Sequence, residues 1–417
     1  MDKKYFPIKT ETACRLKWSW STLYLNSGHT SSCHRASTTV ITPENFFNFH
    51  NTERKIADRQ SMIEGKWPGH GCEYCRDIEK LGGYSDRQFQ NTVPEVYATE
   101  VDSDQLLTTV SPVILEVFFN NNCNLSCLYC TSDLSSRIEA EDKKFGGPII
   151  PITSQYQKNR YEELTPLFWE WMATGYNQLR RLQVMGGEPF LQKDFARLLD
   201  YIEENPNPNL ELNIVTNLII PSKTLESFCS RVSKLLSNNK IKRLDLLASV
   251  DCWGKEQEYI RNGFSCELFE KNVKYLLGRP GIRLGFLSTV TSLSINSMPE
   301  LAKKINEWAT GNELYWYTHL VLPVDSHVLT PGIFDYNIYK HALEEVISLM
   351  PLVIGDKETT VKVFKGIVNK IYLSKFDAIK QQELIKYLEQ IDSRRNLNWR
   401  ETFPWLAKEV IKCGTVK

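Results

Sequence analysis

The sequence has neither a long apolar run nor an excess of either charge. None of its apolar stretches approaches the ~18–20 residues that cross a bilayer. The first residues, MDKKYFPIKTETAC, lack the apolar core of a secretory signal. Lys and Arg together number 50, as do Asp and Glu, so the formal net charge is zero. This balance argues against bulk attraction to nucleic acid or an anionic membrane. We therefore expect a cytoplasmic protein with no membrane and no nucleic-acid partner.

The chain has 11 cysteines, and a cytoplasmic protein with this many requires an explanation. Disulfides are rare in a reducing compartment, where clustered cysteines more often bind metal. Seven cysteines fall in groups before position 131. The remaining four are scattered, and we interpret them as small buried apolar side chains: Cys229, Cys252, Cys266 and Cys413.

Three regions differ in their patterns. Residues 1–110 are rich in Cys, His, Trp, Gly and Asn and poor in periodic segments, so a bound metal is a physical way to hold them together. A polar stretch at 99–109 is expected to connect them to the rest. Residues 111–330 alternate strand and helix patterns, and residues 331–417 have mostly helical patterns. We predict one domain for each of these ranges.

The central region predicts an α/β fold. Six apolar, β-branched runs are typical of strands: 113–119, 180–189, 210–217, 243–251, 282–291 and 314–323. Helical patterns lie between them: 161–176, 194–204, 222–237, 255–277 and 297–310. This alternation predicts a parallel sheet with right-handed crossovers, curled into a partial (β/α)6 barrel. The chemistry of such folds lies at the carboxyl ends of the strands. The polar insertion at 131–160 is expected to lie over that end.

The segment CNLSCLYC places Cys123, Cys127 and Cys130 directly after the first of these strands. Three thiolates on one short loop hold three irons of a [4Fe–4S] cluster and leave the fourth iron without a protein ligand. An open iron binds a chelating small molecule, such as the amino and carboxylate groups of a methionine moiety. Zinc is the alternative, but it requires a fourth ligand from elsewhere. Tyr129 is placed to pack on an adenine or to shield the cluster.

These cysteines, and four landmarks after later strands, are the features by which residues 113–325 resemble the radical S-adenosylmethionine superfamily. The resemblance implies that the cofactor contacts come from the GGEP turn after strand two, a polar pair after strand three, an SxD motif after strand four and an arginine ten residues later. These are Gly186, Gly187, Glu188, Pro189, Thr216, Asn217, Ser249, Asp251 and Arg261. An ordinary tight turn is the alternative for GGEP. Cys252 departs from the glycine that is common in this family.

The resemblance also implies a mechanism. The cluster passes an electron to S-adenosylmethionine, and the 5′-deoxyadenosyl radical that results abstracts a hydrogen atom from a substrate. Orientation and exclusion of water are then the contribution of the protein. A flavodoxin or ferredoxin is the expected electron donor. The catalytic acid or base stays unknown at this stage.

The second group comprises Cys14, Cys33, Cys72 and Cys75. We expect Cys14 and Cys33 on the two strands of a hairpin whose turn is Asn26–Gly28. The spacing resembles the auxiliary-cluster module of the SPASM/twitch subgroup, which in that subgroup usually follows the barrel; here it precedes it. The resemblance implies a second [4Fe–4S] cluster on these four thiolates. Structural zinc on the same four is the alternative.

Many members of this subgroup modify peptides, so the resemblance implies a peptide or protein side chain as the substrate, which is crosslinked or oxidised. The first alternative is radical oxidation or rearrangement of a small metabolite or nucleotide. The second is a non-catalytic, zinc-stabilised binding protein.

Overall fold

The computed structural model describes residues 10–69, 71–91, 110–149, 159–321, 327–350 and 357–412. The predicted connection at 99–109 and Cys413 lie outside the described residues, as does part of the insertion at 131–160. The chain divides into two compact units. The first comprises Met1–Asn121, Gln155–Val215 and Glu226–Leu246, and the second comprises Asn122–Ser154, Thr216–Leu225 and Leu247–Lys417. The predicted boundaries of three domains stay a prediction.

The first unit is built on a mixed sheet with the hydrogen-bonded order β8-β7-β6-β4-β1-β2-β3. Neighbours from β7 to β1 are parallel, whereas β2 and β3 pair antiparallel. The strands are β1 (Trp20–Tyr24), β2 (His29–Ser31), β3 (Thr39–Val40), β4 (Ile114–Phe118), β6 (Arg181–Met185), β7 (Glu211–Thr216) and β8 (Arg243–Ser249), whose far end enters the second unit. The strands predicted at 113–119, 180–189 and 210–217 are confirmed as β4, β6 and β7.

An unpredicted feature is that the N-terminal region adds strands to this sheet. β1 lies parallel to β4, with Thr22 opposite Glu116 and Leu23 opposite Val117. Three consecutive strands of the N-terminal region, β1 to β3, therefore extend the sheet beyond β4. No period-2 run in this region is long enough to predict its pairing with β4.

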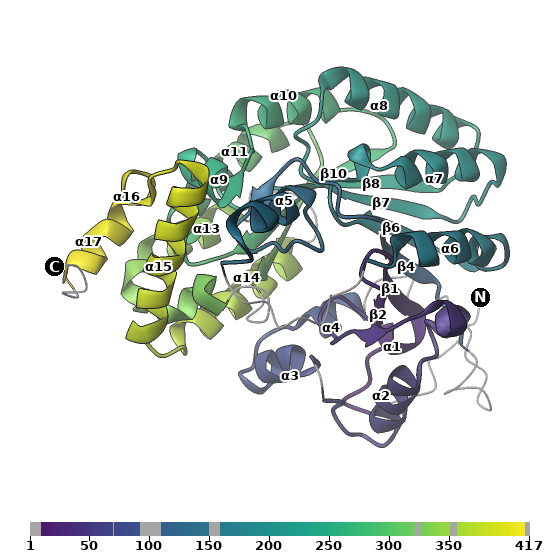
Figure 1. The fold of residues 1–417 in the computed structure, drawn as a ribbon, viewed down its shortest axis with the longest axis horizontal. Coiled ribbons are helices and arrows are strands. Elements are labelled where there is room, and N and C mark those ends of the chain that lie inside the picture. The colour runs from purple at the N-terminus through teal and green to yellow at the C-terminus, as the bar shows by residue number, and fades with distance from the viewer. Residues whose placement is uncertain are drawn as a thin grey trace. The chain divides into compact units, whose positions relative to one another are not determined.

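Helices cover one face of this sheet. They are α6 (Tyr161–Gly175), α7 (Lys193–Glu204) and most of α8 (Ser222–Ser237), and Figure 1 shows α6 and α7 beside β6 and β7. Because side chains alternate along a strand, the fully buried Val117 and Phe119 share one side of β4, and Phe119 meets Phe168 of α6 edge-on at 5.2 Å. The alternate side chain of β4, Glu116, consequently points to the opposite face of the sheet.

The N-terminal region also carries short helices and a hairpin. The helices are α1 (Leu16–Ser19), α2 (Glu53–Ile63), α3 (Glu73–Lys80) and α4 (Asp86–Gln90). The predicted hairpin is confirmed, with Tyr24 opposite His29 and Gly28 at φ +69°. However, the placement of Cys14 and Cys33 on its strands is wrong. Cys14 precedes α1, whose first turn is closed by Lys17 N donating to Cys14 O, and Cys33 follows the end of β2.

The second unit contains the end of β8 and the parallel strands β10 (Ile282–Val290) and β11 (Leu314–Leu320), which confirm the predictions at 282–291 and 314–323. The predicted helix at 297–310 is α11 (Met298–Ala309). The predicted helix at 255–277 is interrupted. It is α9 (Lys255–Ile260) and α10 (Cys266–Leu276), because Arg261 and Asn262 form β9 and pair antiparallel with β5 (Ser126–Cys127).

The rest of the second unit is helical. Part of the predicted insertion folds as α5 (Ser136–Phe145), which is capped by the Ser135 side chain at its start and by the left-handed Gly146 at its end. The C-terminal helices are α13 (Lys340–Leu349), α14 (Lys357–Tyr372), α15 (Ala378–Arg395), α16 (Trp399–Thr402) and α17 (Pro404–Lys412), as the helical pattern predicted. Among the described residues, no helix combines the length and apolarity that a membrane span requires.

Candidate functional site

The three-cysteine loop lies in the second unit and is fixed by backbone pairing. Cys127 pairs with Arg261 across β5 and β9, and Leu128 N donates to Ile260 O at 2.9 Å. Cys130 N then donates to Cys127 O at 3.1 Å, so the chain turns tightly between these two thiols. All three cysteines of the loop are partly exposed. The loop therefore presents its thiols from a rigid backbone rather than from a free segment.

Burial favours the protonated form of the Cys127 and Cys130 thiols. Burial raises the pKa of Cys130 well above its ordinary value, and the negative charges that Cys127 and Cys123 would carry raise it further. Burial also raises the pKa of Cys127, while the Arg261 guanidinium opposes this rise. Since thiolates are the ligands of iron and zinc, loading this loop with metal must release protons.

A buried ion pair lies beside this loop. Asp251 is fully buried, and both of its oxygens are bound by Arg261, with Nε to Oδ2 and Nη2 to Oδ1 each at 2.9 Å. Tyr129 donates its hydroxyl to Asp251 Oδ2 at 2.6 Å, and Thr289 N donates to Oδ1 at 2.9 Å. The structure thus brings together three sequence-predicted residues, and it joins them to one another. Thr289 is a partner that the sequence did not single out.

The backbone of Asp251 is also fixed by a hydrogen bond. Gln257 is fully buried on α9, and its Oε1 accepts from Asp251 N at 3.0 Å and from Cys252 N at 3.1 Å. Cys252 is itself fully buried and lies 3.8 Å from the same oxygen. The residue that departs from the family glycine is therefore packed inside this turn. Gln257 was missed by the sequence interpretation because no motif marks it.

The polar pair after β7 contacts the other end of the cysteine loop. Asn217 Nδ2 donates to Asn124 Oδ1 at 2.7 Å and lies 4.0 Å from Cys123 Sγ. Thr216 Oγ1 accepts from Leu218 N at 2.9 Å, where Leu218 adopts a left-handed φ of +57°. Asn217 thereby lies next to Cys123, while Thr216 shapes the turn that follows the strand. Ser249, the first residue of the SxD motif, is buried at the end of β8.

The Gly-Gly-Glu-Pro turn belongs to the first unit and follows β6. Gly186 and Gly187 have positive φ angles of +81° and +55°. A Cβ at Gly186 would lie 2.4 Å from Phe118 Cδ1, so no larger residue fits without movement. Glu188 is fully buried and caps the short helix that starts at Pro189, by accepting from Phe190 N at 3.3 Å. The glycine at 186 is therefore required by close packing on Phe118, and the predicted approach of this backbone to a ligand stays a prediction.

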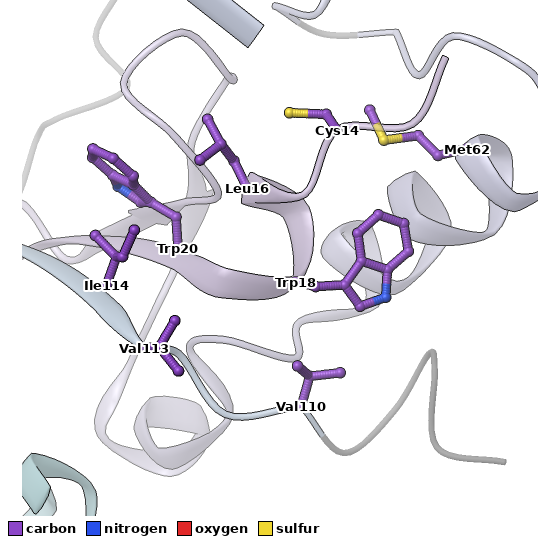
Figure 2. Close-up of a cluster of buried hydrophobic side chains, with 8 residues drawn as sticks. All are labelled: Cys14, Leu16, Trp18, Trp20, Met62, Val110, Val113 and Ile114. Atoms are coloured by element: carbon purple, nitrogen blue, oxygen red, sulfur yellow. The ribbon is translucent and has the colours of Figure 1, made fainter. Parts of the chain in front are cut away.

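The second cysteine group also lies in the first unit, and its four members line one cavity of about 30 Å³: Cys14, Cys33, Cys72 and Cys75. The cavity borders an apolar cluster that includes Cys14, Leu16, Trp18 and Met62, and Cys14 lies beside Met62 in Figure 2. Cys33 and Cys72 pack against the same cluster. Segments far apart in the sequence thus deliver four thiols to one enclosed, largely apolar place.

Charged groups around this cavity are mostly paired. Lys17 Nζ donates to Asp58 Oδ2 at 2.5 Å and also to the Cys72 thiol. Arg35 Nε donates to Asp86 Oδ2 at 2.6 Å. Burial raises the pKa of the Cys72 thiol to about 11. The Cys72 thiol consequently stays protonated at neutral pH until a metal displaces its proton.

The donor sets fit the predicted metal groups, but a single-ion geometry is not formed. Across the described ranges, no three His, Cys, Asp or Glu side chains are grouped closely enough to hold one metal ion. A cubane cluster bonds each thiolate to a different iron, so its ligands need not converge on one point as zinc ligands do. Four thiols around one cavity suit a closed site, and three thiols on one loop suit a site with an open position.

Comparisons with known proteins add little beyond this geometry. No protein-family model matches the chain, and no curated protein matches it. Among solved structures it is similar to Streptococcus suis SuiB bound to precursor peptide SuiA, at 15% identity and a TM-score of 0.39, over 75% of this chain and 64% of that one. SuiB alone matches at 16% identity and the same TM-score, over 75% and 63%. The matched part is thus less than two thirds of SuiB, and a TM-score this low carries no argument about function.

Proposed function

We propose that this chain is a radical S-adenosylmethionine enzyme with a partial (β/α)6 barrel, an N-terminal auxiliary iron–sulfur region and a helical C-terminal region. The observation that carries the proposal is the loop with Cys123, Cys127 and Cys130. Its backbone is fixed by β9, and the pair Asp251–Arg261 lies beside it. Three thiolates and no fourth are the donor set for a [4Fe–4S] cluster with one open iron.

The bound cluster would supply the electron that cleaves S-adenosylmethionine to methionine and the 5′-deoxyadenosyl radical, which then abstracts a hydrogen atom from the substrate. The residues of this chain bind and orient. Arg261 carries a cation beside the loop for the methionine carboxylate. The Gly186–Gly187 backbone provides a close approach for the amino group. Tyr129 stays a phenol, because burial raises its pKa well above the ordinary value, and its ring shields the loop.

The ion pair between Arg261 and Asp251 limits how the cofactor can bind to these two residues. Both oxygens of Asp251 are engaged within the protein, so its predicted ribose contact requires a hydrogen bond from the ribose in addition to, or in exchange for, one of these. Asp251 therefore also positions Arg261. Thr216, Asn217 and Ser249 complete the predicted cofactor contacts, and Asn217 already lies against Cys123.

The cavity with four cysteines is proposed to hold a second [4Fe–4S] cluster. Its four thiolates complete the coordination of such a cluster, so this site would serve electron transfer or stability rather than cofactor binding. Structural zinc on the same four thiolates is the alternative, and it would require the thiols to converge on one ion, which the described side chains do not do.

The substrate is proposed to be a peptide or protein side chain, which is crosslinked or oxidised, with a flavodoxin or ferredoxin as the electron donor. This part of the proposal rests on the likeness of the two cysteine groups to peptide-modifying enzymes. A small metabolite or a nucleotide is the alternative substrate. Mass spectrometry of candidate peptides and metabolites, incubated with the reduced and reconstituted protein, distinguishes them by the loss of hydrogen from one class or the other.

Anaerobic reconstitution tests the proposed chemistry. The wild-type protein should become brown, bind iron at both sites and release 5′-deoxyadenosine from S-adenosylmethionine after reduction. The variant Cys123→Ala/Cys127→Ala/Cys130→Ala should release none and keep the metal of the four-cysteine site. Cys229→Ala is the matched control, because Cys229 is buried in α8 and belongs to neither group. A colourless zinc protein, or a triple variant that still releases 5′-deoxyadenosine, would refute the proposal.

A further inference from the structure

The C-terminal helix α15 contacts the backbone of the cysteine loop directly. Tyr387 donates its hydroxyl to Leu128 O at 2.6 Å, and Arg395 Nη1 donates to Ser126 O at 2.8 Å. These two carbonyls belong to the residues on either side of Cys127. One helix, far along the chain from the loop, thus supplies donors to both carbonyls that flank a proposed cluster ligand.

Arg395 also ties the loop to the helix that follows it. Its Nε and Nη2 donate to the two oxygens of Glu141 on α5, at 2.9 and 3.3 Å. Both side chains are largely buried, with exposed fractions of 6% for Arg395 and 13% for Glu141. A paired, planar guanidinium of this kind has little freedom to move. Arg395 therefore holds α15, α5 and the loop in one arrangement.

The same side chains border the space next to the thiols. A cavity of about 40 Å³ is lined by Cys127 and Cys130, by Tyr387, Ile391 and Arg395 of α15, and by Ile138 and further residues of the 138–149 segment. The helix thus faces the thiols with an aromatic ring, an apolar side chain and a cation.

We propose that Tyr387 and Arg395 are positioning residues of the three-cysteine cluster, so that α15 is a wall of this site. The inference rests on the proposed function, since it concerns a cluster on this loop. Hydrogen bonds to Ser126 O and Leu128 O hold the Cys127 backbone in its ligating conformation. The guanidinium stabilises the additional negative charge of the reduced cluster, which makes reduction easier.

The test compares neighbouring residues of one helix in the full-length reconstituted protein. Arg394→Ala is the matched control, because Arg394 carries the same charge and also pairs with Glu141, at 3.8 Å, but its hydrogen bonds go to Asp142 and Gly147 O rather than to the cysteine loop. Tyr387→Phe removes one hydroxyl and keeps the ring. Arg395→Lys keeps the charge and loses the paired contact with Glu141. The melting temperature of each variant reports whether it folds.

Two readouts separate positioning from simple structural support. The first is the reduction potential of the cluster whose electron paramagnetic resonance signal changes when S-adenosylmethionine is added. It should become more negative in Arg395→Ala, should be largely retained in Arg395→Lys and should be unchanged in Arg394→Ala. The second is the release of iron from that cluster to a chelator, which should be about tenfold faster in Tyr387→Phe, the effect expected for one lost buried hydrogen bond.

Equal potentials and equal release rates in Arg395→Ala, Tyr387→Phe and Arg394→Ala would overturn the inference while leaving the proposed function intact. Failure of the proposed function has a different signature. In that case the wild-type protein itself forms no cluster that responds to S-adenosylmethionine, and the inference falls with it.

Discussion

The two cysteine sites of this chain are built in opposite ways. In the first unit, four thiols come from Cys14, Cys33 and the start of α3, and they meet around an enclosed cavity. In the second unit, three thiols come from one loop of sequential residues, which β9 and α15 hold by its backbone. The four-cysteine site is assembled from residues that are distant in the sequence. The three-cysteine site lies within one short segment, whose backbone other elements then hold in place.

This difference teaches what each site can do. Four thiolates complete the coordination of a cluster or a zinc ion, so that a closed site binds no further ligand. Three thiolates leave a position free, and the buried cation Arg261 lies beside them. The closed site is therefore expected to stabilise or to carry electrons, and the open site to carry the chemistry.

Removal of the four-cysteine site is expected to have the largest effect. The variant Cys72→Ser/Cys75→Ser should lose the metal of that site and should melt at a markedly lower temperature, because the small helices around the cavity have little other core. Release of 5′-deoxyadenosine without substrate should persist, since the open site is untouched. Metal analysis, thermal unfolding and product assays measure these effects.

Cys266→Ser is the control for this variant, as Cys266 is partly exposed on α10 and bonds to Gly254 O. If Cys72→Ser/Cys75→Ser keeps its full metal content, the four-cysteine site does not exist as described. If the folded variant no longer releases 5′-deoxyadenosine, the four-cysteine site is also required for cleavage of S-adenosylmethionine, which contradicts the proposed separation of roles.

The next largest effect concerns the ion pair beside the open site. Asp251→Ala leaves the Arg261 guanidinium buried without its carboxylate, and breaking a buried pair in this way should cost about 3–5 kcal/mol of unfolding free energy. Weaker binding of S-adenosylmethionine should accompany this loss, because Arg261 is no longer positioned. Denaturant unfolding and equilibrium binding measure the two effects.

The exposed residue Asp200 provides the control, since it pairs with Arg231 at the surface and its side chain is 64% exposed. Asp200→Ala should change the unfolding free energy by less than about 1 kcal/mol. Similar losses in the two variants would show that Asp251 has no special role beside the loop.

The smallest effect is a pH dependence of the metal-free protein. Burial raises the pKa of the Cys72 thiol to about 11 and that of Cys75 to about 12, from an ordinary 9.0. The folded state therefore binds more protons than the unfolded state between these values, so stability is full below pH 9 and falls as the pH rises through this window. Metal-loaded protein has already lost these protons and should not show this fall.

Unfolding midpoints of metal-free and metal-loaded protein, measured on both sides of pH 9, test this dependence. In Cys72→Ser/Cys75→Ser the slope of stability against pH should be shallower, because two of the titrating thiols are gone. Identical slopes in all samples would contradict the burial of these thiols.

Much of the central fold could be predicted because its strands are apolar runs with clear ends. Runs such as 113–119 and 282–291 became β4 and β10. The break between α9 and α10 could not be predicted, because it depends on Arg261 and Asn262 pairing with a strand more than a hundred residues earlier. The addition of the β1–β2 hairpin to the sheet escaped prediction for a similar reason. Its turn could be predicted locally, but the pairing of β1 with β4 depends on a distant segment rather than on the pattern of β1 itself.

The site was predicted as a set of residues rather than as a set of contacts. Motif spacing singled out Asp251, Arg261 and Tyr129, but not that they bind one another. Gln257 and Arg395 carry no motif, and only the folded chain brings them to the loop or its ion pair. The convergence of four thiols on one cavity rests on segments as distant as Cys14 and Cys75, and the prediction of a hairpin carrying Cys14 and Cys33 was wrong even though the turn itself was right.

The most direct measurement of the central claim is the hyperfine spectrum of the reduced, reconstituted protein with S-adenosylmethionine labelled with nitrogen-15 at its amino group. The account predicts a coupling between this nitrogen and one cluster, and loss of the coupling in Cys123→Ala/Cys127→Ala/Cys130→Ala. If the wild-type spectrum shows no coupling and does not change when S-adenosylmethionine is added, no iron of the three-cysteine loop is open to the cofactor and the account is wrong.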